Sequence, residues 1–379
     1  MKIKADWLDR AGLQRLMAGL AAAGHPCFAV GGCVRNTLMG LAISDVDLAS
    51  SAPPETVTNT AVRLGYRAIP TGIDHGTVTV VCDGKAYEVT TFRTDISTDG
   101  RHALVRFGAD MAQDAARRDF TINALYVGAD GAVYDPVQGL PDIAAQIVRF
   151  VGDPAARIAE DYLRILRYFR FSAVYADPQH GFDADILAAI SENLDGLARL
   201  SRERIGSEMR KLLAAENPAP ALAAMAATGV LLRILPGADV RLIAPLGHVQ
   251  AGRAPNWLAR LAALGGQDVA NALRLSNREA ADLETLRAQM GGMFSPAALA
   301  WQFGGDMAGD ILALRAVALG GDLPANWQDD IARGIAATCP VTAADFMPHL
   351  SGPALGHALQ VAKKAWLDSD LRANKGDLV

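Results

Sequence analysis

A short apolar run ends in Gly31 and Gly32, and an Asp-x-Asp pair, Asp45 and Asp47, opens the next apolar run. No other feature restricts the fold and chemistry of this chain as strongly. Successive side chains of a strand point to opposite faces, so the two aspartates share one face and Val46 faces the other way. Neighbouring carboxylates repel each other unless a cation binds between them, and hard oxygen ligands suit Mg²⁺. The pair therefore predicts a magnesium site.

The two glycines predict a place where phosphate groups approach the backbone. Val34 and Arg35 begin an apparent helix directly after them. Glycine has no Cβ, and a helix N-terminus favours anions. Taken alone, a Gly-Gly pair is usually a turn, and an Asp-x-Asp pair is usually a solvated strand end. In this order, the two motifs resemble the signature of the polymerase-β-like nucleotidyltransferases.

The length and composition are typical of a globular protein with several domains. A chain of 379 residues is too long for one ordinary core, and we expect roughly two to four domains. Hydrophobic residues make up 51% and charged residues 20% of the chain, which excludes a disordered protein. Aromatic residues make up only 6%, which favours helices over a β-rich fold. The longest apolar runs are too short to span a membrane, so we expect no membrane association.

The cysteines and the charge bear on compartment and partners. Four scattered cysteines form no Cys-x-x-Cys motif, which predicts reduced thiols, a cytoplasmic location and no zinc site. The N-terminus lacks the apolar core of a signal peptide. A net charge of −5 and a pI of 5.8 argue against indiscriminate nucleic-acid binding. A local basic stripe would still allow it.

The first third of the chain mixes helical and strand patterns. Apolar residues at helical spacing predict a helix over residues 6–24. Two β-branched runs, 75–82 and 87–93, flank Asp83–Gly84 and predict a β-hairpin. Glu88 lies on the second strand of this hairpin. If the hairpin packs beside the aspartate strand, Glu88 could be a third carboxylate at the metal site. The alternative is an edge-strand side chain that faces solvent.

The segment from Thr94 to Phe107 is polar, charged and contains Gly100. It predicts a mobile loop, and a loop of this length in a compact domain tends to be functional. A second hairpin at Asp130–Gly131 follows, and residues 135–140 close an α/β unit over residues 1–145. Beyond this unit the β signal disappears and helical periodicity continues to the C-terminus. We therefore expect an α+β protein, with a first domain that contains a sheet and an all-helical remainder.

Residues 160–171 carry the second informative pattern, a row of arginines on one predicted helix. Asp161, Arg164, Arg167 and Arg170 recur at i, i+3 spacing, while apolar residues cover most of the other side. The row could be a solvated basic face that pairs with Asp161. That interpretation does not explain why every cation is arginine. Arginine suits planar, bidentate recognition of bases and phosphates.

Several motifs together resemble one family closely, the class II tRNA nucleotidyltransferases (CCA-adding enzymes), whose superfamily includes the bacterial poly(A) polymerases. They occur in the family order: Gly-Gly-x-Val-Arg with Asp-x-Asp, His-Gly-Thr-Val-Thr-Val at residues 75–80, Arg-Arg-Asp-Phe-Thr-Ile-Asn-Ala at 117–124, Asp-Pro-x-x-Gly at 135–139, and Glu-Asp-x-x-Arg-x-x-Arg-x-x-Arg-Phe at 160–171. One departure is Asn36, where the usual pattern has Asp. An asparagine still accepts a hydrogen bond but carries no charge for an ion pair.

The resemblance implies an architecture and a set of site residues. It implies a polymerase-β-like head with a mixed sheet over residues 1–145, a helical neck that recognises the base over 146–215, and a helical body and tail that bind tRNA over 216–379. The implied site residues are Asp45 and Asp47 for Mg²⁺; Gly31, Gly32 and Arg35 for the nucleotide; Arg118 and Asp119 for the triphosphate and ribose; Asp161 and Arg164 for the base; and Arg167 and Arg170 in support.

The pairing of Asp161 with Arg164 has a physical logic for base choice. Cytosine and adenine both present an amino donor beside a ring-nitrogen acceptor, which a carboxylate and a guanidinium complement. Uracil and guanine reverse that pattern and would leave buried groups unpaired. The resemblance thus implies template-independent addition of CCA to the 3′ end of tRNA from CTP and ATP. It implies two-metal phosphoryl transfer that releases pyrophosphate.

Three rival functions stay open at this point. A poly(A) polymerase is disfavoured because no Gly-Arg-Arg/Lys-Phe run follows the second hairpin strand. A partial enzyme that adds only C or only A is the second rival. A non-catalytic RNA-binding module is the third, and the intact Asp45, Asp47 and Arg118 argue against it. No His-Asp dipeptide occurs, so we expect no added HD-type phosphohydrolase domain.

Overall fold

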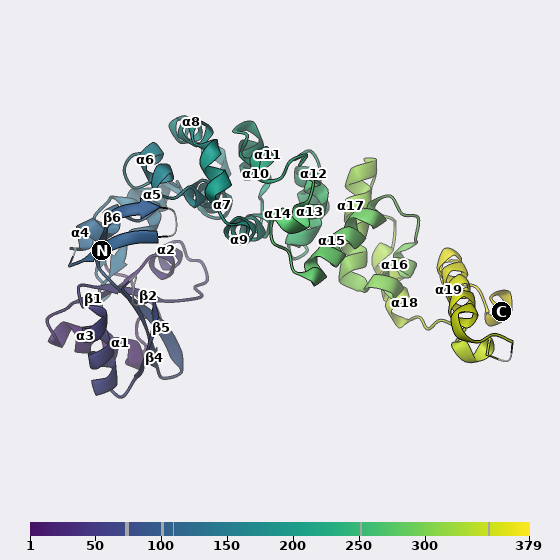
Figure 1. Ribbon diagram of the computed structural model, residues 1–379, viewed down its shortest axis with the longest axis horizontal. Coiled ribbons are helices and arrows are strands. Elements are labelled where there is room, and N and C mark those ends of the chain that lie inside the picture. The colour runs from purple at the N-terminus through teal and green to yellow at the C-terminus, as the bar shows by residue number, and fades with distance from the viewer. Residues whose placement is uncertain (73–75, 100–101, 109, 251, 348) are drawn as a thin grey trace. The chain divides into compact units, whose positions relative to one another are not determined.

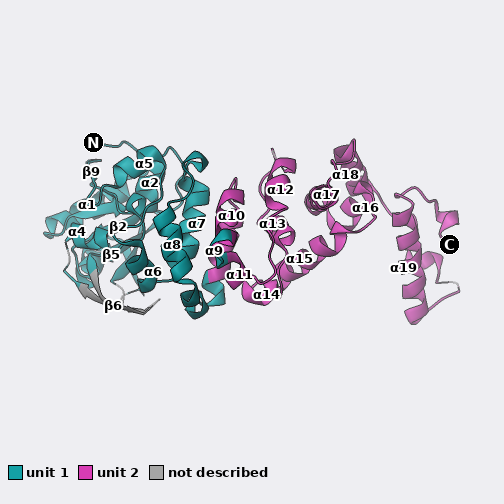
Figure 2. Cartoon of the chain, turned by 90° about the horizontal axis from the view of Figure 1, so that it is seen from above, with its two compact units in different colours: residues 1–204, 227–230 teal, residues 205–226, 231–379 magenta. Residues whose placement is uncertain are grey.

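The structure is a computed structural model that describes residues 1–72, 76–99, 102–108, 110–250, 252–347 and 349–379, with only the backbone described for those between 94 and 106. The chain forms two compact units (Figure 2). Unit 1 comprises Met1–Arg204 with Ala227–Val230, and unit 2 comprises Ile205–Ala226 with Leu231–Val379. Of the sequence-predicted positions, His75, Gly100 and Arg101 lie outside the described residues.

Unit 1 is built on a seven-stranded mixed sheet with the order β3-β4-β5-β2-β1-β8-β9, which confirms the predicted α+β class (Figure 1). The strands are β1 (Cys27–Val30), β2 (Asp47–Ser50), β3 (Arg67–Gly72), β4 (Thr77–Cys82), β5 (Lys85–Thr91), β8 (Tyr126–Val127) and β9 (Val133–Tyr134). Strands β2 and β5 pair in parallel, and the other neighbouring pairs in the sheet are antiparallel. The parallel pair brings two distant segments of the chain together.

Helices α1 (Ala11–Ala22) and α3 (Pro54–Arg63) pack against each other and against the strands. The helix predicted over residues 6–24 is therefore shorter than expected, because residues 6–9 form a turn. Trp7 and Leu8 are buried in this turn, and Trp7 donates a hydrogen bond to the hydroxyl of Thr37 at 2.9 Å. This long-range anchor holds the segment out of the helix that its apolar spacing predicts.

Both predicted hairpins are present, and the predicted loop is not a loop. Asp83 and Gly84, both with positive φ, form the turn between β4 and β5, and Gly131 lies in the turn between β8 and β9. Within the segment from Thr94 to Phe107, expected to be a mobile loop, the described residues instead lie in an antiparallel ribbon of β6 (Arg93–Asp99) and β7 (His102–Phe107). Backbone pairing between the two strands forms this ribbon, which the charged residues of the segment did not predict.

The other helices of unit 1 place the site residues. They are α2 (Gly32–Leu38), α4 (Met111–Ala116), the 3₁₀ turn η2 (Thr121–Asn123), α5 (Gly139–Ala145), α6 (Pro154–Glu160), α7 (Leu163–Tyr175), η3 (Pro178–His180), α8 (Ala184–Glu192) and η4 (Leu194–Arg199). The single helix predicted for the arginine row is broken at Asp161, whose backbone is extended. The Asp161 carboxylate accepts a hydrogen bond from the N–H of Leu163 at 3.1 Å, and such local bonding competes with a continuous helix.

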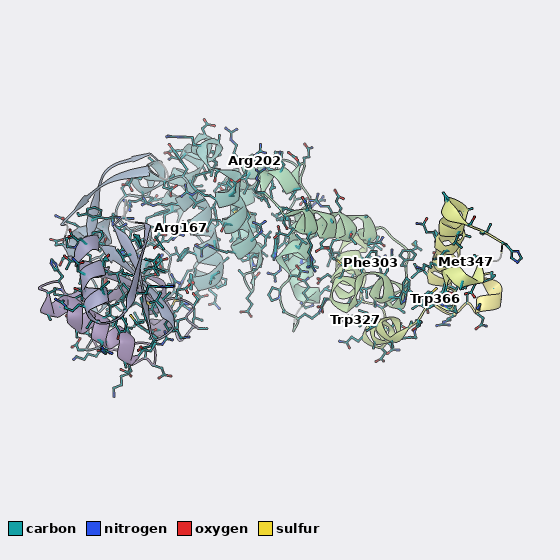
Figure 3. All side chains as sticks on the ribbon, turned by 60° about the horizontal axis from the view of Figure 1, so that its bottom comes forward. Arg167, Arg202, Phe303, Trp327, Met347 and Trp366 are labelled. Carbon is teal, nitrogen blue, oxygen red and sulfur yellow. The ribbon has the colours of Figure 1, made fainter. Side chains whose placement is uncertain are left out.

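The remainder of the chain is helical, as predicted. Its elements are α9 (Arg202–Leu213), α10 (Ala219–Ala227), α11 (Val230–Ile234), α12 (Ile243–Val249), α13 (Trp257–Leu264), α14 (Val269–Ala272), α15 (Asn277–Met290), α16 (Pro296–Phe303), α17 (Gly305–Leu319), α18 (Trp327–Ala336), η5 (Ala343–Asp345), α19 (Gly352–Asp368) and η6 (Lys375–Asp377). Within unit 2, the ring of Trp301 on α16 meets the ring of Trp366 on α19 edge to face; Trp366 is labelled in Figure 3. None of the described helices is long and apolar enough to cross a membrane.

Candidate functional site

Acidic residues from two segments of the chain lie around the start of β2. Asp47 is the first residue of β2, and Glu88 of β5 is its register partner across the parallel pair. Val46 is buried, whereas Asp45 and Asp47 are exposed, as the predicted alternation requires. Glu88 is also exposed. Strand β5 lies between β4 and β2, so the edge-strand alternative is wrong, and Glu88 lies beside the aspartate strand with an exposed side chain.

The electrostatics of this acidic edge suit a bound cation. Although the Asp47 side chain reaches solvent, desolvation by the protein around it raises its pKa, and the neighbouring charges of Glu88 and Asp45 raise that pKa further. A divalent cation would relieve this repulsion, and the exposed carboxylate oxygens are the ligand type that Mg²⁺ prefers. Within the described part of the chain, no group of three or more His, Cys, Asp or Glu side chains is arranged to hold a metal ion. The role of Glu88 as a third ligand therefore stays a prediction.

The two glycines bring the backbone close to two arginines. Gly31 has φ of 76°, a conformation that favours glycine, and it lets β1 turn directly into α2. A Cβ on Gly31 would lie 3.9 Å from a terminal nitrogen of Arg118. A Cβ on Gly32 would lie 3.7 Å from a terminal nitrogen of Arg35. The absence of side chains at this turn leaves the backbone open beside both guanidinium groups.

Two buried side chains, those of Asp114 and Tyr126, hold Arg118 in place. It donates to the carboxylate of Asp114 at 2.9 Å and to the hydroxyl of Tyr126 at 3.1 Å. The Tyr126 hydroxyl in turn donates to Asp114 at 2.7 Å. Burial alone would raise the pKa of Asp114, but the charges of Arg118 and Arg117 hold that pKa below its usual value. Arg118 is therefore fixed in orientation before any ligand binds.

Asp119, which follows α4, is linked to helix α7. Its carboxylate accepts from Arg167 (labelled in Figure 3) at 2.8 Å, from the side chain of Asn123 at 3.0 Å and from the N–H of Phe120 at 2.8 Å. Burial pushes the pKa of Asp119 upward, but the charge of Arg167 and these hydrogen bonds bring that pKa down to about 2. Asp119 is thus occupied by an ion pair within the protein.

Arg35 is buried among neutral partners. It donates to the side-chain oxygen of Asn36 at 3.1 and 2.8 Å, to the hydroxyl of Tyr175 at 2.7 Å, and to the side chain of Asn123. Its guanidinium also lies 4.0 Å from the centre of the Tyr175 ring. Burial lowers the pKa of Arg35. Asn36, in the position where the family pattern has Asp, keeps the hydrogen bonds to Arg35 and supplies no charge.

The structure does not bring Asp161 and Arg164 together as a ridge on one helix. Asp161 precedes α7 and forms an ion pair with Arg204 at 2.6 Å. Arg164 lies on α7, pairs with Glu160 at 2.5 Å and donates to the carbonyl of Arg157 at 2.8 Å. The i, i+3 ion pair with Asp161, which belonged to the alternative of a solvated basic face, is not formed. Each group has found a different partner, because Glu160 ends α6 within reach of Arg164.

Sequence reasoning missed several residues that organise the site. They are Asp114, Asn123, Tyr126, Arg157, Glu160, Tyr175 and Arg204. Two of them carry a local signal, because Asp114 lies four residues before Arg118 and Glu160 four before Arg164, the spacing of helical ion pairs. Tyr175 is 140 residues from Arg35, and no sequence spacing could have revealed that contact.

Comparison with known families and proteins identifies similar chains. The family described as "Poly A polymerase head domain" matches residues 27–149, and the family described as "Probable RNA and SrmB-binding site of polymerase A" matches residues 181–242. The chain is 44% identical over 207 residues to the mitochondrial CCA tRNA nucleotidyltransferase 1 of Mus musculus. The matched region covers 54% of this chain and 48% of the mouse protein. The chain is 39% identical over 221 residues to the CCA-adding enzyme of Limosilactobacillus fermentum, with 57% and 53% covered.

The similarity to a solved structure extends over nearly the whole chain. The crystal structure of the Bacillus stearothermophilus CCA-adding enzyme in complex with CTP matches with a TM-score of 0.75 at 30% identity, over 95% of this chain and 93% of that one. In the curated relatives, by contrast, the matched region spans about half of the relative's length. The match to this solved structure covers residues of both units.

Proposed function

This chain belongs to the family of class II CCA-adding enzymes and poly(A) polymerases, and from that premise we propose that it adds CCA to the 3′ end of tRNA from CTP and ATP. The observation that carries the proposal is the register pairing of Asp47 with Glu88, which gathers acidic groups beside the open Gly31–Gly32 turn. A nucleotidyltransferase needs acidic groups for metal ions beside cationic groups for a triphosphate. Unit 1 carries both.

Asp45 and Asp47 are the residues we assign to Mg²⁺, with Glu88 as a third acidic group. When bound, the metal ion would neutralise charge on the reacting phosphate and on the attacking 3′-oxygen. The raised pKa of Asp47, which arises from burial and from its acidic neighbours, supports this assignment because a cation would reverse the repulsion. In the same proposal, Gly31 and Gly32 leave space for the phosphate groups.

The arginines of unit 1 would bind and orient the nucleotide. Arg118 is already oriented by Asp114 and Tyr126, so binding costs little further side-chain entropy. Arg35 carries a charge that no carboxylate in the described residues pairs with directly, and it would meet the triphosphate. Asp119 would act through Arg167, and Arg170 would support the same cluster. The pyrophosphate would dissociate from these arginines after the transfer.

Base selection stays with Asp161 and Arg164 in this proposal, although they no longer pair with each other. The Asp161 carboxylate has an acceptor capacity beyond its bonds to Arg204 and Leu163, and so can accept from an amino group. Arg164 donates to the carboxylate of Glu160 and to the carbonyl of Arg117. In this proposal, it would move away from Glu160 and donate to a ring nitrogen of the base instead. This arrangement would favour cytosine and adenine over uracil and guanine.

The remaining assignments are part of the same proposal. We place the head at residues 1–145, the neck at 146–215, and the tRNA-binding body and tail at 216–379. We also propose a reducing compartment such as the cytoplasm, because all four cysteines are free and three of them are buried. CTP is the ligand named for the B. stearothermophilus structure, and the mouse protein is named for tRNA.

One experiment separates the proposed function from its rivals. The protein is incubated with tRNAs that end before CCA, after C and after CC, each with single NTPs and then with CTP and ATP together, and products are resolved at single-nucleotide length. We expect addition of two C residues and one A residue, and then arrest. Unlimited A addition would indicate a poly(A) polymerase, and addition that stops after C residues would indicate a partial enzyme. The Asp47→Ala variant serves as the control and should be inactive while it still binds tRNA.

A further inference from the structure

Three guanidinium groups lie close to one phenyl ring on α7, the ring of Phe171. The central carbon of Arg170 lies 4.3 Å from the centre of the Phe171 ring, that of Arg167 lies 5.1 Å away and that of Arg35 lies 5.2 Å away. Arg167 and Arg170 come from the same helix as the ring, whereas Arg35 comes from α2. The ring is therefore the shared neighbour of cations from two separate segments.

The Phe171 ring is fixed in place. Its side chain is only 4% exposed. The ring of Phe120 lies 5.0 Å from it and the ring of Tyr175 lies 5.3 Å from it. Phe120 is itself fully buried and packs on Phe150 at 4.9 Å. A ring packed among other rings cannot swing away when its cationic neighbours repel one another.

The electrostatics explain why an aromatic ring is useful at this point. Three neighbouring guanidinium groups repel one another, and the negative face of an aromatic ring attracts each of them. Burial is the main reason that the pKa of Arg35 is lowered, and the charges of Arg170 and Arg167 add to the lowering. Arg167 is neutralised by Asp119, but the hydrogen-bond partners of Arg35 are neutral. The cluster therefore keeps positive charge for an anion.

We propose that Phe171 is a positioning residue that holds Arg35, Arg167 and Arg170 as one anion-binding cluster for the triphosphate of the incoming nucleotide. The inference rests on the proposed function for the identity of the anion. Phe171 touches no reacting atom in this scheme and acts through the three arginines. Tyr175 holds Arg35 from a second side, through its ring and its hydroxyl.

The chain supplies a matched control for this inference in Phe169. This residue lies on the same helix, is fully buried, and packs on the rings of Tyr168 and Phe182. Among the described residues, no guanidinium lies over its ring. Phe169→Leu and Phe171→Leu therefore remove the same atoms from one helix, but only the second removes the aromatic face that the arginines share.

The test measures nucleotide kinetics and anion binding for both variants. We expect Phe171→Leu to raise the KM for CTP and for ATP about tenfold, with kcat changed less than about threefold, and to weaken binding of inorganic tripolyphosphate by a similar factor in calorimetry. Phe169→Leu should lower Tm as much as Phe171→Leu does. It should nevertheless leave KM, kcat and the affinity for tripolyphosphate within about twofold of the wild-type values. Equal effects of the two variants on KM and on tripolyphosphate binding would overturn the inference.

A second pair of variants keeps the test valid if Phe171→Leu does not fold. Tyr175 is only half-buried, so it tolerates substitution better. Tyr175→Phe keeps the ring over Arg35 and should preserve most of the tripolyphosphate affinity, whereas Tyr175→Leu should lose several-fold. Equal affinities in these two variants would overturn the role of the aromatic face. If wild-type protein binds tripolyphosphate in a Phe171-dependent way but adds no nucleotide to tRNA, the proposed function fails while the anion cluster stands.

Discussion

Glu88 and Asp47 are register partners on the parallel strands β5 and β2, so both carboxylates project from the same face of the sheet. They are 41 positions apart in sequence, from 47 to 88, and only this pairing brings them together. The charge of Glu88 is, after burial, the strongest reason that the pKa of Asp47 is raised. The two residues therefore share one electrostatic environment, whether or not they share a metal ion.

Replacing Glu88 with Gln should reduce nucleotide addition at least a hundredfold and leave the fold intact. The substitution keeps the shape of the side chain and removes one negative charge from the acidic edge. Steady-state turnover with a tRNA that ends in CC measures the effect. Glu55→Gln is the control, because Glu55 is exposed in the first turn of α3. A loss of less than about tenfold, roughly 1.4 kcal/mol, would mean that Glu88 is only a surface residue.

The same substitution should lower the pKa of Asp47. Burial would still keep that pKa above the usual value for aspartate, but the repulsion from Glu88 would be gone. Titration of the Asp47 carboxyl carbon by NMR, in metal-free protein, measures the change directly. We expect ionisation of Asp47 to begin at lower pH in Glu88→Gln than in the wild type. An unchanged titration curve would show that the two carboxylates do not interact.

Asp161→Ala should weaken discrimination between bases. Removal of the carboxylate deletes an acceptor for the amino group of cytosine and adenine, so UTP incorporation relative to CTP should rise about tenfold or more. Single-nucleotide incorporation with each NTP measures the ratio. Asp185→Ala, an exposed position in the first turn of α8, is the control. Unchanged selectivity in Asp161→Ala would mean that the base is read by other groups.

The ion pair between Asp119 and Arg167 should make the free energy of unfolding depend on pH. The folded pKa of Asp119 is about 2, and the unfolded value is about 3.9. Because the folded pKa is lower, the stabilisation is complete above pH 4 and is lost as the pH falls toward 2. The loss should be about 2 to 3 kcal/mol in the free energy of unfolding. Urea unfolding of the wild type and Asp119→Asn between pH 2 and 5 tests this, since the variant should show a shallower decline. Parallel declines would contradict the assignment.

The ribbon of β6 and β7 should control the last addition. One site must accept cytosine and then the larger adenine, so a segment outside the rigid helices has to adjust. Replacing residues 96–104 with a short Gly/Ser linker should preserve the addition of two C residues and stall the product before A. The C additions of the same variant are the internal control for folding. Full CCA addition at an ordinary rate would show that the ribbon is not needed.

Short-range patterns predicted much of unit 1 correctly. The alternation of Asp45, Val46 and Asp47 and the Asp83–Gly84 turn depend on neighbouring residues, and both appear as expected. The helix break at Asp161 was missed because its carboxylate bonds to the backbone locally and to Arg204 at long range. An apolar pattern at helical spacing contains no information about such competition.

Long-range contacts were out of reach of the sequence. Asp119 and Arg167 are 48 residues apart, and Arg35 and Tyr175 are 140 apart. Arg35, Asp119 and Arg167 were predicted as separate nucleotide contacts, whereas the structure joins Arg35 to Asp119 through the side chain of Asn123. The ribbon was missed for a related reason, because the charged residues and Gly100 of the segment favoured a loop, whereas strand pairing is a contact between two segments that such a local pattern does not contain.

The contacts that helix α7 makes with the head have a consequence for how the chain is made. During synthesis, a ribosome-bound chain that has emerged only as far as residue 145 contains Asp119 and Arg35 but neither Arg167 nor Tyr175. The Asp119 carboxylate would then lack its Arg167 partner, and the Arg35 guanidinium would lack both of its aromatic neighbours, Phe171 and Tyr175. We expect the nascent head to remain open to protease until α7 has emerged. Protease digestion of nascent chains that are stalled when residue 145, or residue 177, is the last to have emerged from the ribosome would reveal the difference.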